Sequence, residues 1–187
     1  MRTGGRLVFE DDFDRKEIGD AWLDTGGGYR IVDGALRIQG AKNKPLWLKH
    51  ELPRDARVEF TARSESPEVD IKAEFFGDGK SRAERVSYTA TSYVVILGGW
   101  NNKRSIIARM NEHGDDRFVR ESPKGIQGKT YRFAVARKGK SFKWYLNDEL
   151  FLEMTDTSPL VGSGHDHFAF NNWASEVFFD DLRIFEL

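Results

Sequence analysis

Residues 131–153 read YRFAVARKGKSFKWYLNDELFLE, and this stretch decides the fold class. Apolar residues recur at every second position through Tyr131–Ala136 and again through Phe142–Leu146, a period that places alternate side chains on one face of a β-strand. Lys138-Gly139-Lys140 predicts the turn of a hairpin, and Asn147-Asp148 predicts a second tight turn. The stretch is therefore predicted to be a three-stranded meander.

The same two-residue period runs through most of the chain. It is clearest in Arg57–Arg63, whereas helix signals are confined to Asp14–Trp22. Further strands are expected at 7–10, 29–32, 35–39, 45–50, 69–76, 85–97, 104–110, 116–120, 166–173 and 176–185. About thirteen short strands must close or cover their edges, which predicts an all-β two-sheet sandwich or a barrel. No repeat, linker or change in composition divides the chain, so residues 1–187 are expected to form one domain.

Composition excludes several classes of protein. The 29 Lys and Arg residues balance 30 Asp and Glu residues, which argues against a nucleic-acid partner held by bulk electrostatics. No apolar run is long enough to span a membrane, and the first residues lack the apolar stretch of a signal peptide. The absence of Cys removes disulfides, thiol nucleophiles and thiolate metal sites. Compartment and oligomeric state stay open.

Three separated motifs carry a family resemblance. Phe9–Phe13 (FEDDF), Tyr29–Ile38 (YRIVDGALRI) and Phe178–Ile184 (FFDDLRI) resemble, in this order, the concanavalin A-like lectin/glucanase superfamily. The meander is similar to the laminin-G-type pattern, and Leu97–Asn102 (LGGWNN) is similar to a segment of small bacterial members. The resemblance implies a two-sheet antiparallel jelly roll in which the first and last strands pair, and a role that involves sugars.

The resemblance also implies a calcium site where the terminal strands meet. The matching positions are Asp180, Gly34 and Glu10, of which only Asp180 donates a side chain. Calcium binds six to eight hard oxygens from carboxylates and carbonyls, and Asp11 and Asp12 would add negative charge nearby. The alternative is that Asp180 bounds a strand and accepts main-chain hydrogen bonds. Calcium is thus a candidate structural cofactor.

Glu68–Glu74 (EVDIKAE) resembles the catalytic strand of retaining glucanases, with a Glu-x-Asp-x-Glu pattern. If the protein is an enzyme, the resemblance implies that Glu68, Asp70 and Glu74 supply its carboxylates. Retaining glycosidases need two carboxyl groups about 5–5.5 Å apart. Six residues of strand separate Glu68 from Glu74 by about 20 Å, and Lys72 stands where the third acid is expected. A solvent-facing row of charges is therefore the favoured alternative.

Two further segments, far apart in the chain, have the composition of a sugar site. Sugars present apolar C–H faces and a rim of hydroxyls, so their sites combine aromatic platforms with amide and guanidinium donors. Trp100 and Trp173 are the expected platforms, and the expected hydroxyl-binding side chains are Asn101, Asn102, Arg104 and Asn172. The alternative is that both Trp residues lie in the core or at a rim and the Asn pairs form turns.

These observations favour binding of a poly- or oligosaccharide on the concave face of a β-sandwich. Two alternatives stay open. One is a glycoside hydrolase or related enzyme that uses the acids of the Glu68–Glu74 strand, and the other is a protein-interaction sandwich, because fold does not decide function.

Overall fold

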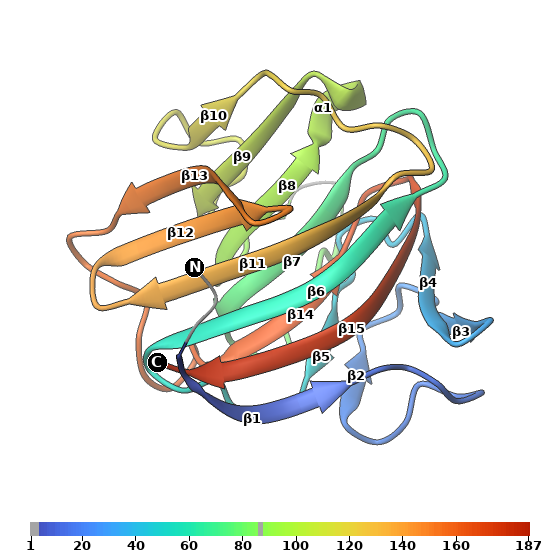
Figure 1. Cartoon of the computed structure of the whole chain (residues 1–187), viewed down its shortest axis with the longest axis horizontal. Coiled ribbons are helices and arrows are strands. Elements are labelled where there is room, and N and C mark those ends of the chain that lie inside the picture. Colours follow the sequence, from blue (N-terminus) through green and yellow to red (C-terminus); the bar gives the residue numbers. More distant parts are fainter. Residues whose placement is uncertain (1–3, 86–87) are drawn as a thin grey trace.

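The computed structural model describes residues 4–85 and 88–187, which form two antiparallel sheets packed face to face (Figure 1). The eight-stranded sheet has the order β13 (Glu149–Thr155), β12 (Ser141–Leu146), β11 (Thr130–Lys138), β6 (Ala56–Ser64), β15 (Glu176–Glu186), β4 (Ala35–Gln39) and β3 (Arg30–Val32), and β1 (Arg6–Asp11) pairs with β15. The seven-stranded sheet has the order β10 (Phe118–Arg120), β9 (Arg104–Arg109), β8 (Tyr93–Gly98), β7 (Ile71–Gly77), β14 (His167–Asn171), β5 (Leu46–Leu48) and β2 (Trp22–Asp24). The all-β sandwich that the sequence predicts is confirmed.

The meander lies at one edge of the eight-stranded sheet, as predicted. Strands β11, β12 and β13 pair in sequence, and β11 also pairs with β6. Asn147 and Asp148 have φ angles of 51° and 73°, which matches the primed two-residue turn that the twist of a hairpin favours.

The two ends of the chain lie side by side. Strand β1 pairs antiparallel with β15, from Arg6 opposite Glu186 to Asp11 opposite Leu182. Figure 1 shows β1 in blue beside β15 in dark red. The predicted pairing of first and last strands is therefore confirmed, and it places the acidic residues of both strands together.

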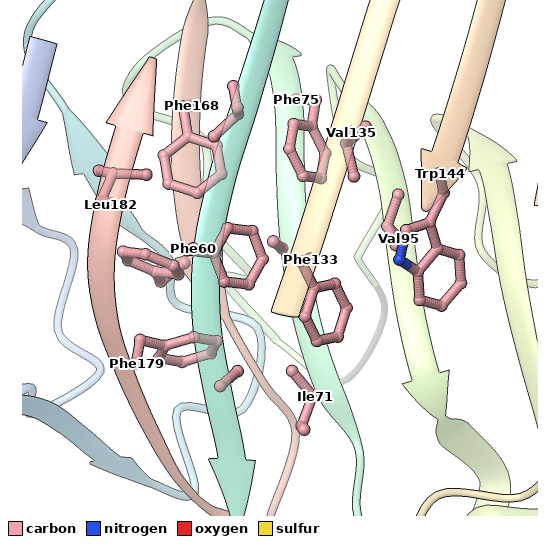
Figure 2. Packing of buried hydrophobic residues seen from close by; sticks show 14 of the residues in the cluster. Phe60, Ile71, Phe75, Val95, Phe133, Val135, Trp144, Phe168, Phe179 and Leu182 are labelled. Carbon is pink, nitrogen blue, oxygen red and sulfur yellow. The ribbon is translucent and has the colours of Figure 1, made fainter. Parts of the chain in front are cut away.

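Aromatic side chains fill the space between the sheets. Phe60 of β6 stacks on Phe133 of β11 with ring centroids 4.8 Å apart (Figure 2). Phe60 also meets Phe170 of the opposite sheet edge-on, with ring centroids 5.3 Å apart. Phe170 in turn stacks on Phe179 at 4.3 Å. Offset and edge-on ring pairs of this kind add to the burial of apolar area that holds the sheets together.

Two expectations are wrong in detail. The helix expected at Asp14–Trp22 is absent: residues 14–21 form bends and a turn, and Trp22 begins β2. The Arg15 guanidinium donates hydrogen bonds to the carbonyls of Glu17 and Ile18, which competes with helical bonding there. The strand expected at 85–97 begins only at Tyr93; Val86 and Ser87 lie outside the described residues.

In the described part of the chain, no helix has the length and apolar character needed to span a bilayer.

Candidate functional site

A pocket of about 1000 Å³ lies on the outer face of the seven-stranded sheet. On β7 the odd-numbered Ile71, Ala73 and Phe75 belong to the core cluster, so the even-numbered Lys72 and Glu74 belong to the opposite face. The residues around the pocket come from β7 and the segment before it, from β8, from the turns after β8 and β14, from the loop at 111–113, and from positions 43, 85, 88 and 89. The polar and aromatic side chains that line the pocket include Asn43, Glu68, Asp70, Lys72, Arg85, Tyr88, Trp100, Asn101, Glu112, His113 and Trp173.

Lys72 lies at the floor of this pocket, where its side chain is only 2% exposed. Its Nζ donates to Asn43 Oδ1 at 2.6 Å and to the Glu112 carboxylate, and it lies 5.7 Å from the centre of the Tyr88 ring. A buried ammonium is costly unless it is paired and hydrogen-bonded. The loop that carries Glu112 is therefore bound to the centre of the sheet.

Glu74 is fully buried beneath the pocket and does not line it. Its carboxylate accepts hydrogen bonds from the Tyr88 hydroxyl, from Ser92 Oγ at 2.6 Å and from Asn171 Nδ2 at 2.7 Å. Burial raises the pKa of Glu74, against the lowering effect of Lys72 and of these donors. These bonds also explain why β8 begins late, since the segment before it crosses the outer face to reach Glu74.

Asp70 lies on the wall of the pocket and is half-buried. Its Oδ2 accepts the main-chain N–H of Trp173 at 2.9 Å. Burial raises the pKa of Asp70 to about 6; Lys72 lowers it and Glu112 raises it further. A carboxyl group with this pKa changes its charge close to neutral pH, which is a common property of groups that act on a ligand.

The pocket wall beside Trp100 has an unusual backbone. In α1 (Gly99–Asn102), Trp100, Asn101 and Asn102 all have φ angles between 53° and 59°, so the turn is left-handed. The Lys103 N–H closes it onto the Gly99 carbonyl at 3.0 Å. Left-handed residues other than glycine cost about 1–2 kcal/mol each, and strain of this kind is concentrated at functional sites.

A second strained segment supports this turn. Val69 has a φ of 61° and Asp70 a φ of 45°, and a β-branched residue rarely adopts such an angle. Val69 is fully buried between two glycines, since a Cβ on Gly98 would lie 2.8 Å from Val69 Cβ and one on Gly125 would lie 2.7 Å from Val69 Cγ1. Val69 thus fixes the position of both Asp70 and the Trp100 turn.

The two tryptophans that the sequence singled out line this one pocket from different strand ends. Trp173 is 42% exposed, and Lys42 Nζ lies 4.6 Å from its ring centre. Trp100 is half-buried, with the guanidinium of Arg104 at 5.8 Å and that of Arg117 at 5.4 Å from its ring. The geometry therefore brings together two aromatic surfaces that are 73 positions apart in sequence.

The four predicted hydroxyl-binding side chains separate into two groups. Asn101 is exposed in the pocket and Arg104 is half-buried beside Trp100. Asn102 instead donates to the Gly125 carbonyl and accepts its N–H, and Asn172 accepts the Ala41 N–H and donates to the Ser175 carbonyl. The prediction that Asn102 and Asn172 bind hydroxyl groups does not fit this arrangement, because main-chain groups occupy both ends of each amide.

The three predicted catalytic acids lie at different depths. Glu68 is exposed at the rim, Asp70 is on the wall and Glu74 is buried below the floor. The alternative prediction, a row of solvent-facing charges along this strand, is wrong, because Lys72 and Glu74 are buried. Sequence reasoning missed Glu112, because it lies in an irregular loop with no motif around it.

The predicted calcium ligands lie around the paired terminal strands. Asp180 Oδ1 accepts the Asp181 N–H at 2.7 Å, and burial together with Asp181, Asp12 and Asp11 raises the pKa of Asp180. The described residues contain no group of three or more His, Asp or Glu side chains that could hold a metal. A calcium ion here would depend mainly on main-chain carbonyls such as those of Glu10 and Gly34, so calcium stays a prediction.

Comparison with solved structures shows the class of fold. The Emp47p carbohydrate recognition domain superposes with a TM-score of 0.70 and 14% sequence identity over 96% of both chains. The carbohydrate-binding module CBM66 from Bacillus subtilis superposes with a TM-score of 0.69 and 13% identity, over 89% of this chain and 96% of the module. The laminarinase catalytic domain from Thermotoga maritima gives 0.65 at 13% identity over 98% of both. The chain has the concanavalin A-like jelly-roll fold, as its motifs predicted.

No protein-family model matches the sequence, and no curated protein matches it.

Proposed function

We propose that the protein binds a poly- or oligosaccharide in the outer-face pocket. The observation that carries this proposal is the pair of tryptophans, Trp100 and Trp173, on the walls of a pocket of about 1000 Å³ with charged and amide groups at its floor. Sugar rings stack on such aromatic surfaces while their hydroxyls meet the polar groups. Of the three Asn side chains predicted to bind hydroxyls, Asn101 lines the pocket and makes no hydrogen bond to the described residues. Carbohydrate-binding modules and lectin domains with the same fold support the proposal.

Affinity electrophoresis through gels that contain different polysaccharides tests this proposal. We expect one glycan to slow the protein, and we expect Trp173→Ala to remove most of the retardation, because the exposed ring contributes contact area and little stability. Phe118→Ala is the matched control, since Phe118 is 41% exposed on β10 and does not line the pocket. Equal retardation of wild type and Trp173→Ala would contradict the assignment of this site. No retardation by any glycan would favour a protein partner.

One observation favours a second candidate, hydrolysis of the bound glycan. Asp70 faces the pocket with a pKa of about 6, so it can hold a proton for a leaving group at mildly acidic pH. Glu68 at the rim and Glu112 at the floor are the other carboxylates that line the pocket. Glu74 is excluded from this role because it is fully buried.

Release of reducing ends from the glycan that slows the protein tests hydrolysis. Activity should fall as pH rises through about 6 and should be lost in Asp70→Asn, while retardation in the gel persists. Unchanged turnover in Asp70→Asn would remove Asp70 from any reaction. Retardation without turnover would leave a binding protein.

A further inference from the structure

Lys72 has one hydrogen-bond donor more than its neighbours use. Of the three N–H groups on its Nζ, one binds Asn43 and one binds Glu112, and the third has no acceptor among the described residues. The side chain is almost fully buried, yet it lines the pocket. A neutral sugar does not need a buried cation at this position, whereas an anionic group does.

Further positive charge surrounds the two tryptophans. Arg85 is exposed at the mouth, and Lys42 lies over the Trp173 ring. Arg104 and Arg117 lie against Trp100 but do not line the pocket, so they add positive charge behind the ring rather than contacts to a ligand.

Three carboxylates also line the pocket, and their positions decide the sign of the charge that a ligand meets. Glu68 is exposed at the rim, where solvent screens it. Asp70 has a pKa raised to about 6, so it takes up a proton only at mildly acidic pH. Glu112 forms an ion pair with Lys72 and comes from a loop, not from the sheet. The Glu112 carboxylate therefore occupies the position at which the acidic group of a ligand would bind Lys72.

We propose that the ligand is an acidic glycan whose carboxylate or sulfate group binds the Lys72 ammonium and competes there with Glu112. The inference rests on the proposed function, since it names the class of sugar that the same pocket takes. Arg85 at the mouth attracts the acidic chain, and Trp173 stacks on a ring beside the charged group. The anionic group replaces a contact that the protein already makes with Glu112.

Matched pairs of polysaccharides separate this inference from the proposed function. Polygalacturonate is compared with its methyl ester, which lacks the charge, and dextran sulfate is compared with dextran. We expect the acidic member of one pair to bind at least tenfold more tightly, and the pair that responds identifies carboxylate or sulfate. Equal binding within both pairs would overturn the inference and leave the proposed function standing. Absence of binding to these glycans and to a panel of neutral polysaccharides would overturn both.

Two variants test the role of Lys72. Glu112→Gln removes the competing charge, so the affinity for the acidic glycan should rise about tenfold. Glu68→Gln removes the same charge from the exposed rim and should raise the affinity by much less. The neutral pair Lys72→Met with Glu112→Gln should lose the preference for the acidic glycan, with melting curves to show that it folds. Equal effects of Glu112→Gln and Glu68→Gln, or a preference that survives in the double variant, would overturn the inference.

Discussion

Carboxylates gather in two regions of this sandwich, and the two regions treat them differently. Where the terminal strands meet, the Asp11 carboxylate accepts hydrogen bonds from both Nη groups of Arg15, from the Trp22 indole N–H and from the Phe13 main-chain N–H. Burial disfavours its charge, but these donors together lower the pKa of Asp11. In the outer-face pocket, the pKa of Asp70 is raised to about 6, because burial outweighs the lowering effects of Lys72 and of the main-chain N–H groups of Trp173 and Ala174.

The difference shows which carboxylates are structural. Asp11 has a dedicated cation and its charge is fixed, so it holds the Asp14–Trp22 segment against β1. Asp70 shares one buried cation with Glu74 and Glu112, and it faces a hollow. A carboxyl group that is incompletely paired at a pocket wall is available for a ligand, whereas a fully paired one is not.

The largest effect is expected from removing the shared cation. Lys72→Met leaves the buried carboxylates around it without compensation, which should lower the free energy of unfolding by about 3–5 kcal/mol. Arg15→Met should cost only about 1 kcal/mol, because the Arg15 side chain is 34% exposed and water replaces part of the interaction. Urea unfolding measures both.

The charge-neutral pair controls for lost packing at Lys72. Lys72→Met with Glu112→Gln should recover part of the loss, since the carboxylate that is hydrogen-bonded to Lys72 is then gone while Asp70 and Glu74 remain. If Lys72→Met costs no more than Arg15→Met, the two regions do not differ in the way that their geometry indicates.

The strained backbone of the pocket gives the next largest effect. Gly98→Ala places a methyl group 2.8 Å from Val69 Cβ and 2.7 Å from Asn102 Oδ1, at a φ of 73°, and should cost about 2–3 kcal/mol. Gly128→Ala has nearly the same φ, 75°, with no atom within 4 Å, and should cost about 1 kcal/mol. Equal midpoints in urea for the two variants would show that Val69 does not hold the Trp100 turn.

Much of the fold was predictable from the sequence, because alternation and turn residues are local signals. The pairing of the end strands was predicted only through the family resemblance that the three separated motifs carry. The pocket was only partly predictable. Trp100 and Trp173 were found through composition, but the sequence does not show that Asn172 is bonded to main chain, nor that Glu112 reaches Lys72 from 40 residues away. Contacts of this kind depend on register and loop path, and neither has a local signature.

A smaller effect, of opposite sign in the two regions, is expected from Asp→Asn changes. The raised pKa of Asp70 means that the folded state binds its proton more readily than the unfolded state, so this group's contribution to stability is present at acidic pH and is lost as pH rises through about 6. Asp70→Asn should therefore raise the free energy of unfolding at pH 7 by about 1–2 kcal/mol and should flatten the pH dependence between about pH 4 and 6.

Asp11→Asn should lower the free energy of unfolding at pH 7 by about 1–2 kcal/mol, because Arg15 loses its ionic partner. Thermal unfolding at several pH values compares the two variants directly. If both variants change the free energy of unfolding in the same direction, the surroundings of Asp11 and Asp70 do not have opposite effects on the two carboxylates.

The smallest effect concerns the terminal strands, where calcium is predicted. Asp180 lies with Asp181, Asp12 and Asp11 around it, and Arg15 is bound to Asp11 rather than to Asp180. One carboxylate and a few carbonyls bind calcium only weakly, so millimolar calcium should raise the melting temperature by about one to two degrees. Chelator should reverse the rise, and Asp180→Ala should abolish it. An equal rise in Asp180→Ala would place the ion elsewhere, and no rise in either protein would mean that Arg15 alone supplies the positive charge that this cluster of carboxylates needs.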